Sequence, residues 1–306
     1  MAFGRCGGLR LRAGHVAVSL LLAAGLLLVP GPAAAADDLA VFWGRNTTEG
    51  SLREACDTGR YTTVLISFLS GFGGRGAPAL DLAGHPVPAV GADIKHCQSR
   101  GVLVLLSIGG PAGEYSLPSP QAAAGLADHL WHAYLGGARA GVPRPFGDAA
   151  VDGVDFFIAQ DAPASQPQHY DELARRLRSH GGAGAGGVTL TATVQCRYPD
   201  PRQAAALATG VFDRVQVRMY GDLRCTWSAR EAWEAWAAAY PGSRVLLGLV
   251  ASPEADKDAY MFQKDLYYNL LQFIKKVPNY GGMAIWNRYY DKKTGYTGGE
   301  PTDPIH

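Results

Sequence analysis

The sequence predicts an α/β protein with a (β/α)8 (TIM) barrel in a single domain. Between residues 37 and 306, eight short runs rich in β-branched and other apolar residues alternate with longer helical patterns. This alternation is typical of parallel βαβ units. Several of the runs are apolar almost throughout, as expected for strands whose two faces are both buried. Eight such units in a domain of this length favour a closed barrel.

The alternative to a barrel is an open, doubly wound sheet. Such a sheet normally carries a glycine-rich nucleotide-binding loop after its first strand. Residues 44–48 read GRNTT at this place, which does not fit that motif. We therefore favour the barrel and expect no cofactor.

The predicted elements follow one another in regular order. The strands are expected at residues 39–45, 62–72, 101–110, 153–160, 189–196, 214–220, 244–250 and 282–289. The helices are expected at residues 50–58, 90–99, 121–135, 169–180, 201–209, 229–240 and 264–276.

The N-terminus has the pattern of a secretory signal peptide. Three arginines and no acidic residue precede or border an apolar run at residues 16–29, and small residues follow at 33–36. The apolar run is shorter than the roughly 20 residues that span a membrane. Residues 1–36 are therefore predicted to be a signal peptide, with a membrane anchor as the alternative, and residues 37–306 to be the mature, extracellular domain.

The charge of the mature chain excludes two classes of partner. The leader carries three arginines, so its removal changes the formal net charge from +1 to −2. A nearly neutral, slightly acidic surface gives no electrostatic reason to bind nucleic acid or an anionic membrane. We expect a monomer.

Four cysteines remain in the mature chain: Cys56, Cys97, Cys196 and Cys225. In an exported chain an even number suggests disulfides, and four cysteines allow three pairings. The predicted topology favours Cys56–Cys97, on neighbouring helices, and Cys196–Cys225, on adjacent loops. Their spacing does not favour a metal site.

Asn46 begins the triplet Asn-Thr-Thr, which is an N-glycosylation sequon. An exported chain would meet the glycosylation machinery, although such triplets are often unused. Glycosylation of Asn46 is therefore left open.

The fourth predicted strand carries the most specific motif, which reads DGVDFFIA from Asp152 to Ala159. It resembles the D-G-x-D-x-D-x-E motif of the family 18 glycoside hydrolases. Asp152, Gly153 and Asp155 match. Phe157 stands where that family has a second inner aspartate, and Ala159 stands where it has its glutamate.

This departure implies a loss of hydrolysis. Strand side chains alternate, so residues 155, 157 and 159 point together into the barrel mouth. The resemblance implies that the glutamate protonates the glycosidic oxygen, and Ala159 has no such proton. Phe157 is expected to fill part of the sugar's space. Gln160 points to the other face, and Asp161 is the alternative acid if the chain is a working chitinase. Asp155 is expected to be a buried structural carboxylate.

Other residues also match the family. Residues 107–110 read SIGG, like the S-x-G-G element that ends its third strand. Tyr220 matches a tyrosine near the reacting sugar, and Trp286 matches the aromatic floor beneath it. Either side chain could instead be ordinary core.

Within that family, long stretches resemble the plant class III chitinase branch and, inside it, the xylanase inhibitor proteins. These stretches are FWGRN and EGSLREACD near the first strand, GADIKHCQS, PRPFGD, LTATV and NYGGMAI. The resemblance implies binding to microbial xylanases of family 10, family 11 or both. The resemblance implies that two regions contact the xylanase: the loop after the fourth helix and the helix before the seventh strand.

A basic side chain in either region could enter the acidic cleft of a xylanase. The first region is a glycine-rich loop without Lys or Arg, and the second has Ala235 where a lysine is expected. Arg178, His180 and Arg230 are the possible substitutes, although each could be an ordinary solvated side chain.

The sequence thus supports a catalytically inactive, chitinase-like defence protein that inhibits xylanases. The alternative is a lectin that binds chitin or N-acetylglucosamine oligomers without cleaving them. A working chitinase and a storage or defence protein without a ligand remain as further hypotheses.

Overall fold

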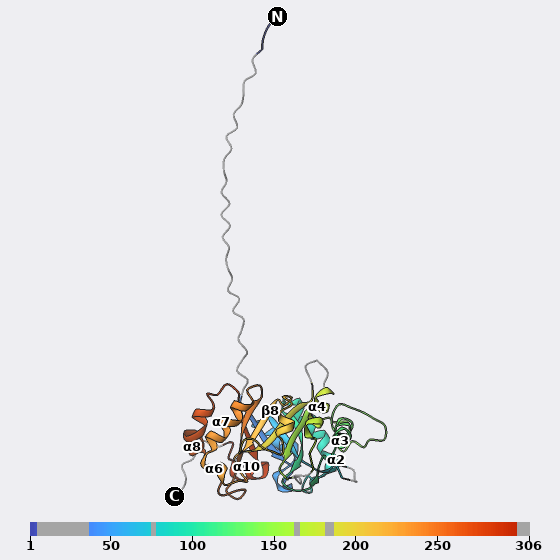
Figure 1. Ribbon diagram of the computed structural model, residues 1–306, viewed down its shortest axis with the longest axis vertical. Helices are drawn as coiled ribbons and strands as arrows, with labels where there is room; N and C mark the ends of the chain where they lie inside the picture. Colours follow the sequence, from blue (N-terminus) through green and yellow to red (C-terminus); the bar gives the residue numbers. More distant parts are fainter. Residues whose placement is uncertain (5–36, 75–77, 162–165, 181–186, 299–306) are drawn as a thin grey trace. The chain divides into compact units, whose positions relative to one another are not determined.

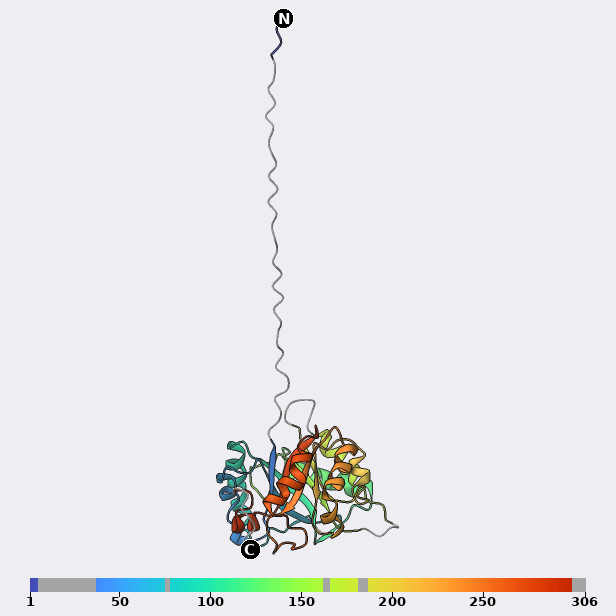
Figure 2. The same ribbon diagram turned by 90° about the vertical axis from the view of Figure 1, so that its left-hand side faces the viewer.

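A computed structural model describes residues 1–4, 37–74, 78–161, 166–180 and 187–298 of the 306-residue chain. The predicted signal peptide lies outside the described residues, apart from residues 1–4. The described residues after Ala36 form one compact unit (Figures 1 and 2).

Eight parallel strands close into a barrel, which confirms the predicted fold class. The order around the barrel is β1-β2-β4-β6-β7-β8-β9-β10, and β10 pairs again with β1. The barrel strands are β1 (Asp38–Trp43), β2 (Thr63–Phe72), β4 (Leu103–Gly110), β6 (Gly153–Ile158), β7 (Thr189–Gln195), β8 (Arg214–Arg218), β9 (Arg244–Val250) and β10 (Tyr280–Trp286). Two short strands, β3 (Ala79–Leu80) and β5 (Glu114–Tyr115), extend the end of β2.

The helices lie outside the strands (Figure 1). They are α1 (Leu52–Asp57), α2 (Val87–Ser99), α3 (Pro120–Ala133), α4 (Tyr170–Ser179), α5 (Ala204–Leu207), α6 (Arg224–Trp227), α7 (Ala229–Ala239), α8 (Gln263–Leu266), α9 (Gln272–Ile274) and α10 (Arg288–Thr294). A 3-10 turn, η1 (Thr47–Glu49), follows β1, and a π-helical segment, η2 (Tyr267–Leu271), joins α8 to α9.

Two apolar layers follow from the alternation of strand side chains. Outward-facing residues such as Val154 and Phe156 of β6 pack with the helices in the main core. Inward-facing residues form a smaller core inside the barrel, which includes Phe42, Phe68 and Phe157. The interior is therefore filled by side chains, as is usual for this fold.

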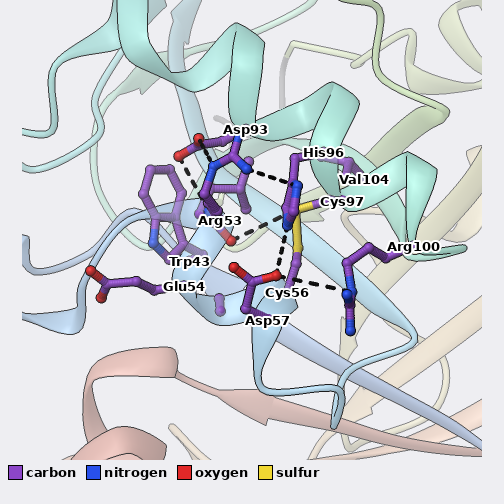
Figure 3. The surroundings of a disulfide bond; sticks show 12 residues. Trp43, Arg53, Glu54, Cys56, Asp57, Asp93, His96, Cys97, Arg100 and Val104 are labelled. Carbon is purple, nitrogen blue, oxygen red and sulfur yellow. Dashed lines mark hydrogen bonds and ion pairs between the residues drawn. A yellow bond between two sulfur atoms is a disulfide. The ribbon is translucent and has the colours of Figure 1, made fainter.

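Both predicted disulfides are confirmed. Cys56 of α1 is bonded to Cys97 of α2, with 5.4 Å between the Cα atoms, and Cys196 is bonded to Cys225 at 5.7 Å. Figure 3 shows the first of these bonds beside a chain of polar contacts between the same two helices. In this chain, Arg53 contacts Asp93 and His96, and the Nε2 atom of His96 lies 2.6 Å from Oδ1 of Asp57. The disulfide thus reinforces a contact that the helices already make.

Some predicted boundaries differ from the structure. The eighth strand ends at Trp286 rather than at residue 289, because the side chain of Asn287 caps α10 by accepting a hydrogen bond from the backbone N–H of Tyr290. The helix predicted at residues 264–276 contains the π-helical segment η2. Of the helix predicted at residues 201–209, only α5 is α-helical.

Candidate functional site in the barrel mouth and on the surface

Asp155 lies fully buried inside the barrel at the centre of a polar cluster. Its carboxylate accepts hydrogen bonds from Ser107 Oγ and Thr191 Oγ1 at 2.7 Å, and from Thr193 Oγ1 at 3.0 Å. Gln216 Nε2 lies 3.4 Å from Oδ1. The donors come from β4, β7 and β8, which the strand register aligns with Asp155.

These surroundings have opposite effects on the acidity of Asp155. Burial is the largest effect and raises the pKa of Asp155 to about 6, while the hydrogen bonds from Ser107, Thr191 and Thr193 lower it. Both carboxylate oxygens are engaged by the protein. Asp155 therefore holds four barrel strands together and presents no free oxygen to a sugar.

Phe157 occupies the barrel interior above Asp155 and is 1% exposed. The centroid of its ring lies 5.7 Å from that of Phe42, 5.2 Å from that of Phe68 and 6.0 Å from that of Trp286. Aromatic rings at these distances and inclined to each other pack favourably. The ring fills the space in which a second carboxylate would otherwise stand.

Ala159 follows β6 and packs its methyl group against the interior core. Its backbone N–H donates to the hydroxyl of Tyr115 at 3.1 Å, and its carbonyl accepts from Arg202 Nη1 at 2.7 Å. The other candidate acid, Asp161, has a side chain that is 85% exposed and lies 3.7 Å from Arg202. Neither residue places an acidic proton inside the mouth.

Tyr220 and Trp286 are packed against other aromatic rings. Trp286 is half-buried and lies 5.3 Å from Phe42, 6.0 Å from Phe68 and 6.2 Å from Tyr220, measured between ring centroids. The Tyr220 side chain is almost completely enclosed, which raises its pKa. The aromatic floor is thus largely covered by the protein's own rings.

Asp152 and Gly153 have structural roles at the start of β6. The carboxylate of Asp152 accepts hydrogen bonds from the Val104 N–H at 2.7 Å and from Gln98 Nε2 at 3.1 Å. A Cβ atom at Gly153 would lie 2.0 Å from the carbonyl oxygen of Thr189. A side chain at residue 153 would therefore push β6 and β7 apart.

Arg218 is a residue of the mouth that sequence reasoning missed. Its guanidinium carbon lies 4.6 Å above the ring of Phe157 and 5.9 Å from that of Tyr220. The alternation of β8 could have identified it, because Arg218 lies between the inward-facing residues Gln216 and Tyr220.

The three candidate partner-binding residues have different surroundings. The guanidinium of Arg178 donates to the carbonyls of Val188 and Val211 and pairs with Asp213 at 2.7 Å. It is therefore held against the protein. His180, at the C-terminal end of α4, stacks on the ring of Trp131 with centroids 4.6 Å apart and planes inclined by 6°.

Burial lowers the pKa of His180. The glycine-rich loop that follows it, residues 181–186, lies outside the described residues.

Arg230 lies on α7 beside the ring of Phe273, which is one of four exposed aromatic side chains in residues 262–273. It pairs with Glu234 at 2.8 Å, and its guanidinium carbon lies 4.2 Å above the ring of Phe273. The exposed set, here called the aromatic surface, comprises Phe262 (47% exposed), Tyr267 (50%), Tyr268 (56%) and Phe273 (38%). Unlike Arg178, Arg230 thus belongs to a surface that a protein partner could cover.

Asn46 caps η1. Its Oδ1 accepts hydrogen bonds from the backbone N–H of Thr48 at 2.9 Å and from the Thr48 hydroxyl at 2.7 Å. Buried Glu49 accepts from the backbone N–H of Asn46 at 2.9 Å and completes the capping box. Asn46 remains partly exposed, as a glycan acceptor must be.

In the described ranges, no helix has the length and apolarity to cross a membrane. Within the same residues, no group of three or more His, Cys, Asp or Glu side chains is arranged to hold a metal ion.

The sequence model of glycosyl hydrolases family 18 matches residues 38–251. Xylanase inhibitor protein 2 of Oryza sativa subsp. japonica is 64% identical over 270 residues, which cover 87% of this chain and 91% of that protein. Xylanase inhibitor protein 1 of Triticum aestivum is 48% identical and is matched over 93% of its length by 91% of this chain. An acidic endochitinase of Arabidopsis thaliana is 39% identical, with coverage of 85% and 87%.

Among solved structures, the xylanase and α-amylase inhibitor protein XAIP-II of Scadoxus multiflorus superposes with a TM-score of 0.80. Its sequence is 38% identical, and the match covers 85% of this chain and 96% of that one. A related inhibitor, XAIP-I, was solved in complex with trehalose, has the same TM-score and identity, and is covered over 97%.

Proposed function

Because this chain belongs to glycosyl hydrolase family 18, we propose that it is a non-hydrolytic member of that family which inhibits microbial xylanases. One observation carries the proposal: the chain is similar to cereal xylanase inhibitor proteins along almost their whole length. The chemistry of the barrel mouth supports the absence of hydrolysis independently.

Hydrolysis by the family's substrate-assisted route needs a proton donor and a carboxylate that orients the substrate. In this chain the corresponding positions are Ala159 and Phe157. The methyl group of Ala159 donates no proton, and the ring of Phe157 is locked among three other rings. Loss of general acid catalysis alone reduces a rate by about 10²–10⁴-fold.

We therefore propose that residues on the outer surface, rather than in the barrel mouth, bind the xylanase. We assign the main contact to α7 and the aromatic surface, which meet where α7 contacts α9 and Arg230 lies over the ring of Phe273. Arg230 supplies a positive charge for the carboxylates of a xylanase cleft, and the exposed tyrosines supply apolar area that is suited to interfaces. Trp131 and His180 form a second, smaller candidate contact beside the loop after α4.

The decisive experiment is a titration of residues 37–306 against one family 10 xylanase, one family 11 xylanase and one α-amylase. We expect saturable inhibition of at least one of the two xylanases. The α-amylase is included because the similar XAIP-II is named as an inhibitor of both enzyme classes. If neither xylanase is inhibited at micromolar concentrations of the protein, the proposal is wrong.

We also propose that the protein is secreted into the plant extracellular space after cleavage near Ala36. Two disulfides support an oxidising compartment. Expression of the full chain in plant cells, followed by N-terminal sequencing of the protein recovered outside the cells, tests this proposal. Treatment of the same sample with a glycosidase would show whether Asn46 carries a glycan.

Sugar binding without hydrolysis is a second candidate function. It rests on Trp286, which keeps part of its surface exposed despite its aromatic neighbours. Titration with chitin oligomers tests it, and binding should be lost in Trp286→Ala. Binding that survives this substitution would remove Trp286 from the proposal.

A further inference from the structure

A cavity of about 580 Å³ lies behind the C-terminal end of β6, on the outer side of the barrel wall. Ile158, the last residue of β6, lines this cavity. Like Phe156, it belongs to the core between strands and helices, whereas Phe157 belongs to the core inside the barrel. Strand β6 thus separates the cavity from the barrel mouth. A volume of this size is typical of small-molecule sites in proteins.

The walls of the cavity are mainly apolar and rigid. Besides Ile158, they include Pro167 and Pro201, from the segments that follow β6 and β7, and Ala205 on α5. Tyr170, the first residue of α4, also lines the cavity. Proline rings and a buried aromatic ring change shape little, so a rigid, flat ligand loses little entropy when it packs against them.

Two tyrosines line the cavity, and their hydroxyl groups differ. The hydroxyl of Tyr115 donates to the Gly110 carbonyl at 2.7 Å. It also accepts from the backbone N–H groups of Ala159 and Gln160, at 3.1 Å and 3.0 Å. The hydroxyl of Tyr170, a residue that is 3% exposed, forms no hydrogen bond with any residue that the structure describes. An enclosed hydroxyl without a partner is costly, and a ligand in the cavity can supply that partner.

The Tyr170 hydroxyl can both donate and accept a hydrogen bond. Burial raises the pKa of Tyr170, and the neighbouring Tyr115 adds to this effect. The group therefore keeps its proton at any pH near neutrality. Because it is the unpartnered polar group of the cavity, it selects a ligand that carries a hydroxyl of its own.

The charged groups beside the cavity are already paired. Arg202 lines the cavity and pairs through Nε with buried Asp200 at 2.9 Å. Its other guanidinium nitrogens donate to the Ala159 carbonyl and to the side chain of Gln195. Asp161 lies 3.7 Å from Arg202, and its side chain is 85% exposed to water. The described lining thus offers no unpaired cation to an anionic ligand, which would lose its hydration without compensation.

We propose that this cavity binds a neutral, hydroxylated aromatic compound, that is, a phenol. The aromatic ring packs against Ile158 and the two prolines, and the phenolic hydroxyl bonds the hydroxyl of Tyr170. The proposal is independent of xylanase inhibition, which we assign to α7 and the aromatic surface. It is also independent of sugar binding in the barrel mouth, because β6 lies between the two sites.

Calorimetric titration of residues 37–306 with three probes tests the class of ligand. The compound 2-naphthol carries the aromatic rings and a neutral hydroxyl. Decahydro-2-naphthol has a similar size and the hydroxyl but no aromatic ring, and 2-naphthoate has the rings and a negative charge. We expect 2-naphthol to bind with a dissociation constant on the order of 0.1 mM, and the other two at least tenfold more weakly.

Equal binding of decahydro-2-naphthol would mean that the cavity accepts any apolar alcohol. Equal binding of 2-naphthoate would mean that charge does not matter. Either result, or no binding of 2-naphthol, overturns the proposal.

Two substitutions locate the ligand. Tyr170→Phe removes the hydroxyl and keeps the ring, so it should weaken 2-naphthol binding about threefold to tenfold. Ala205→Trp fills the cavity from α5 and should abolish binding. Ala208→Trp is the matched control, because Ala208 is exposed at the end of the same helix and does not line the cavity.

The aromatic surface supplies a second control. Tyr268→Ala should bind 2-naphthol like the wild type, and a loss of binding in this variant would place the probe on that surface and contradict the proposal. If Ala205→Trp does not fold, as judged by circular dichroism, Tyr170→Phe decides the question. Unchanged affinity in a folded variant of Tyr170 or Ala205 would show that the ligand binds elsewhere.

Discussion

The hydroxyl oxygen of Thr193 lies 3.0 Å from both carboxylate oxygens of Asp155. Together with Ser107 and Thr191, it encloses a side chain that the hydrolase motif would use in catalysis. In this chain the aspartate links neighbouring strands of the barrel. This structural role should be visible in the pH dependence of stability.

The substitution Asp155→Asn should change that pH dependence. The pKa of Asp155 is about 6 in the folded protein, above its ordinary value of 3.8. The folded state therefore holds the proton more tightly, and the resulting stability is complete below about pH 4 and is lost as the pH rises through 6. Between pH 4 and pH 7, the free energy of unfolding of wild type minus that of the variant should fall, by up to about 3 kcal/mol.

Urea denaturation of both proteins at several pH values between 4 and 7 measures this difference. Other carboxylates with shifted pKa values, such as Asp222, are present in both proteins and cancel. A difference that does not change with pH would mean that Asp155 is already ionised throughout this range.

The substitution Phe157→Ala should destabilise the protein strongly. The side chain is 1% exposed and packs against three aromatic rings, so its removal leaves a cavity inside the barrel. Large-to-small changes of this kind cost about 3–5 kcal/mol. Phe262→Ala, at a residue that is 47% exposed, is the control and should cost much less. Similar losses in the two variants, measured by chemical denaturation, would contradict the packing described for Phe157.

The substitution Ala159→Glu should not produce a chitinase. The introduced carboxyl group restores the family's proton donor in sequence, but Phe157 still fills the space of the orienting aspartate. The guanidinium of Arg202, whose Nη1 lies 2.7 Å from the carbonyl oxygen of Ala159, would also favour the ionised form of the new carboxyl group, whereas a general acid must carry a proton. Release of a chromophore from a chitin oligomer measures the outcome. Turnover by this single variant would show that Phe157 does not block the cleft.

The substitution Arg230→Ala should weaken xylanase inhibition by at least tenfold. It removes the positive charge of α7 and the side chain that covers Phe273. Loss of a central, charged interface residue commonly costs more than about 2 kcal/mol. Arg175→Ala is the control, because both arginines form ion pairs with an acid four residues away on an exposed helix.

Inhibition constants against the most sensitive xylanase compare the variants. If Arg230→Ala and Arg175→Ala both inhibit like the wild type, the contact lies elsewhere on the surface.

Removal of either disulfide should lower the free energy of unfolding by similar amounts. The bonds close segments with sequence separations of 41 and 29 residues. Loop-closure entropy predicts a loss of about 4 kcal/mol for the Cys56→Ser/Cys97→Ser variant and a few tenths less for the other pair. Guanidinium denaturation measures both. A much smaller loss for the first pair would mean that the polar contacts between α1 and α2 hold these helices without the bond.

The barrel could be predicted from the sequence because its signal is repetitive. Eight apolar runs predict eight strands. The order of the strands and helices then indicates which cysteines lie close enough to form disulfides. The short strands β3 and β5 were not foreseen, because each consists of two residues and depends on its pairing with the end of β2. The π-helical segment was not foreseen either, since its residues have an ordinary helical pattern.

The site was only partly predictable. The alternation of β6 identifies Asp155, Phe157 and Ala159 as residues that share a face. The partners of Asp155, by contrast, come from three other strands, and the register that aligns them is a tertiary property. Arg218 was not predicted, because the family motif lies on β6 and not on β8. The alternation of side chains along β8 would have placed Arg218 in the mouth.

The closure of the barrel by β1 has a consequence for the order of events during synthesis. β1 pairs with β2 on one side and with β10 on the other, and Asp38 pairs with Arg244 at 2.9 Å. The first strand to leave the ribosome must therefore wait for the last one, a delay on the order of tens of seconds at ordinary rates of translation. During this interval one edge of β1 lacks its neighbour, and an unpaired strand edge of this kind can pair with another chain.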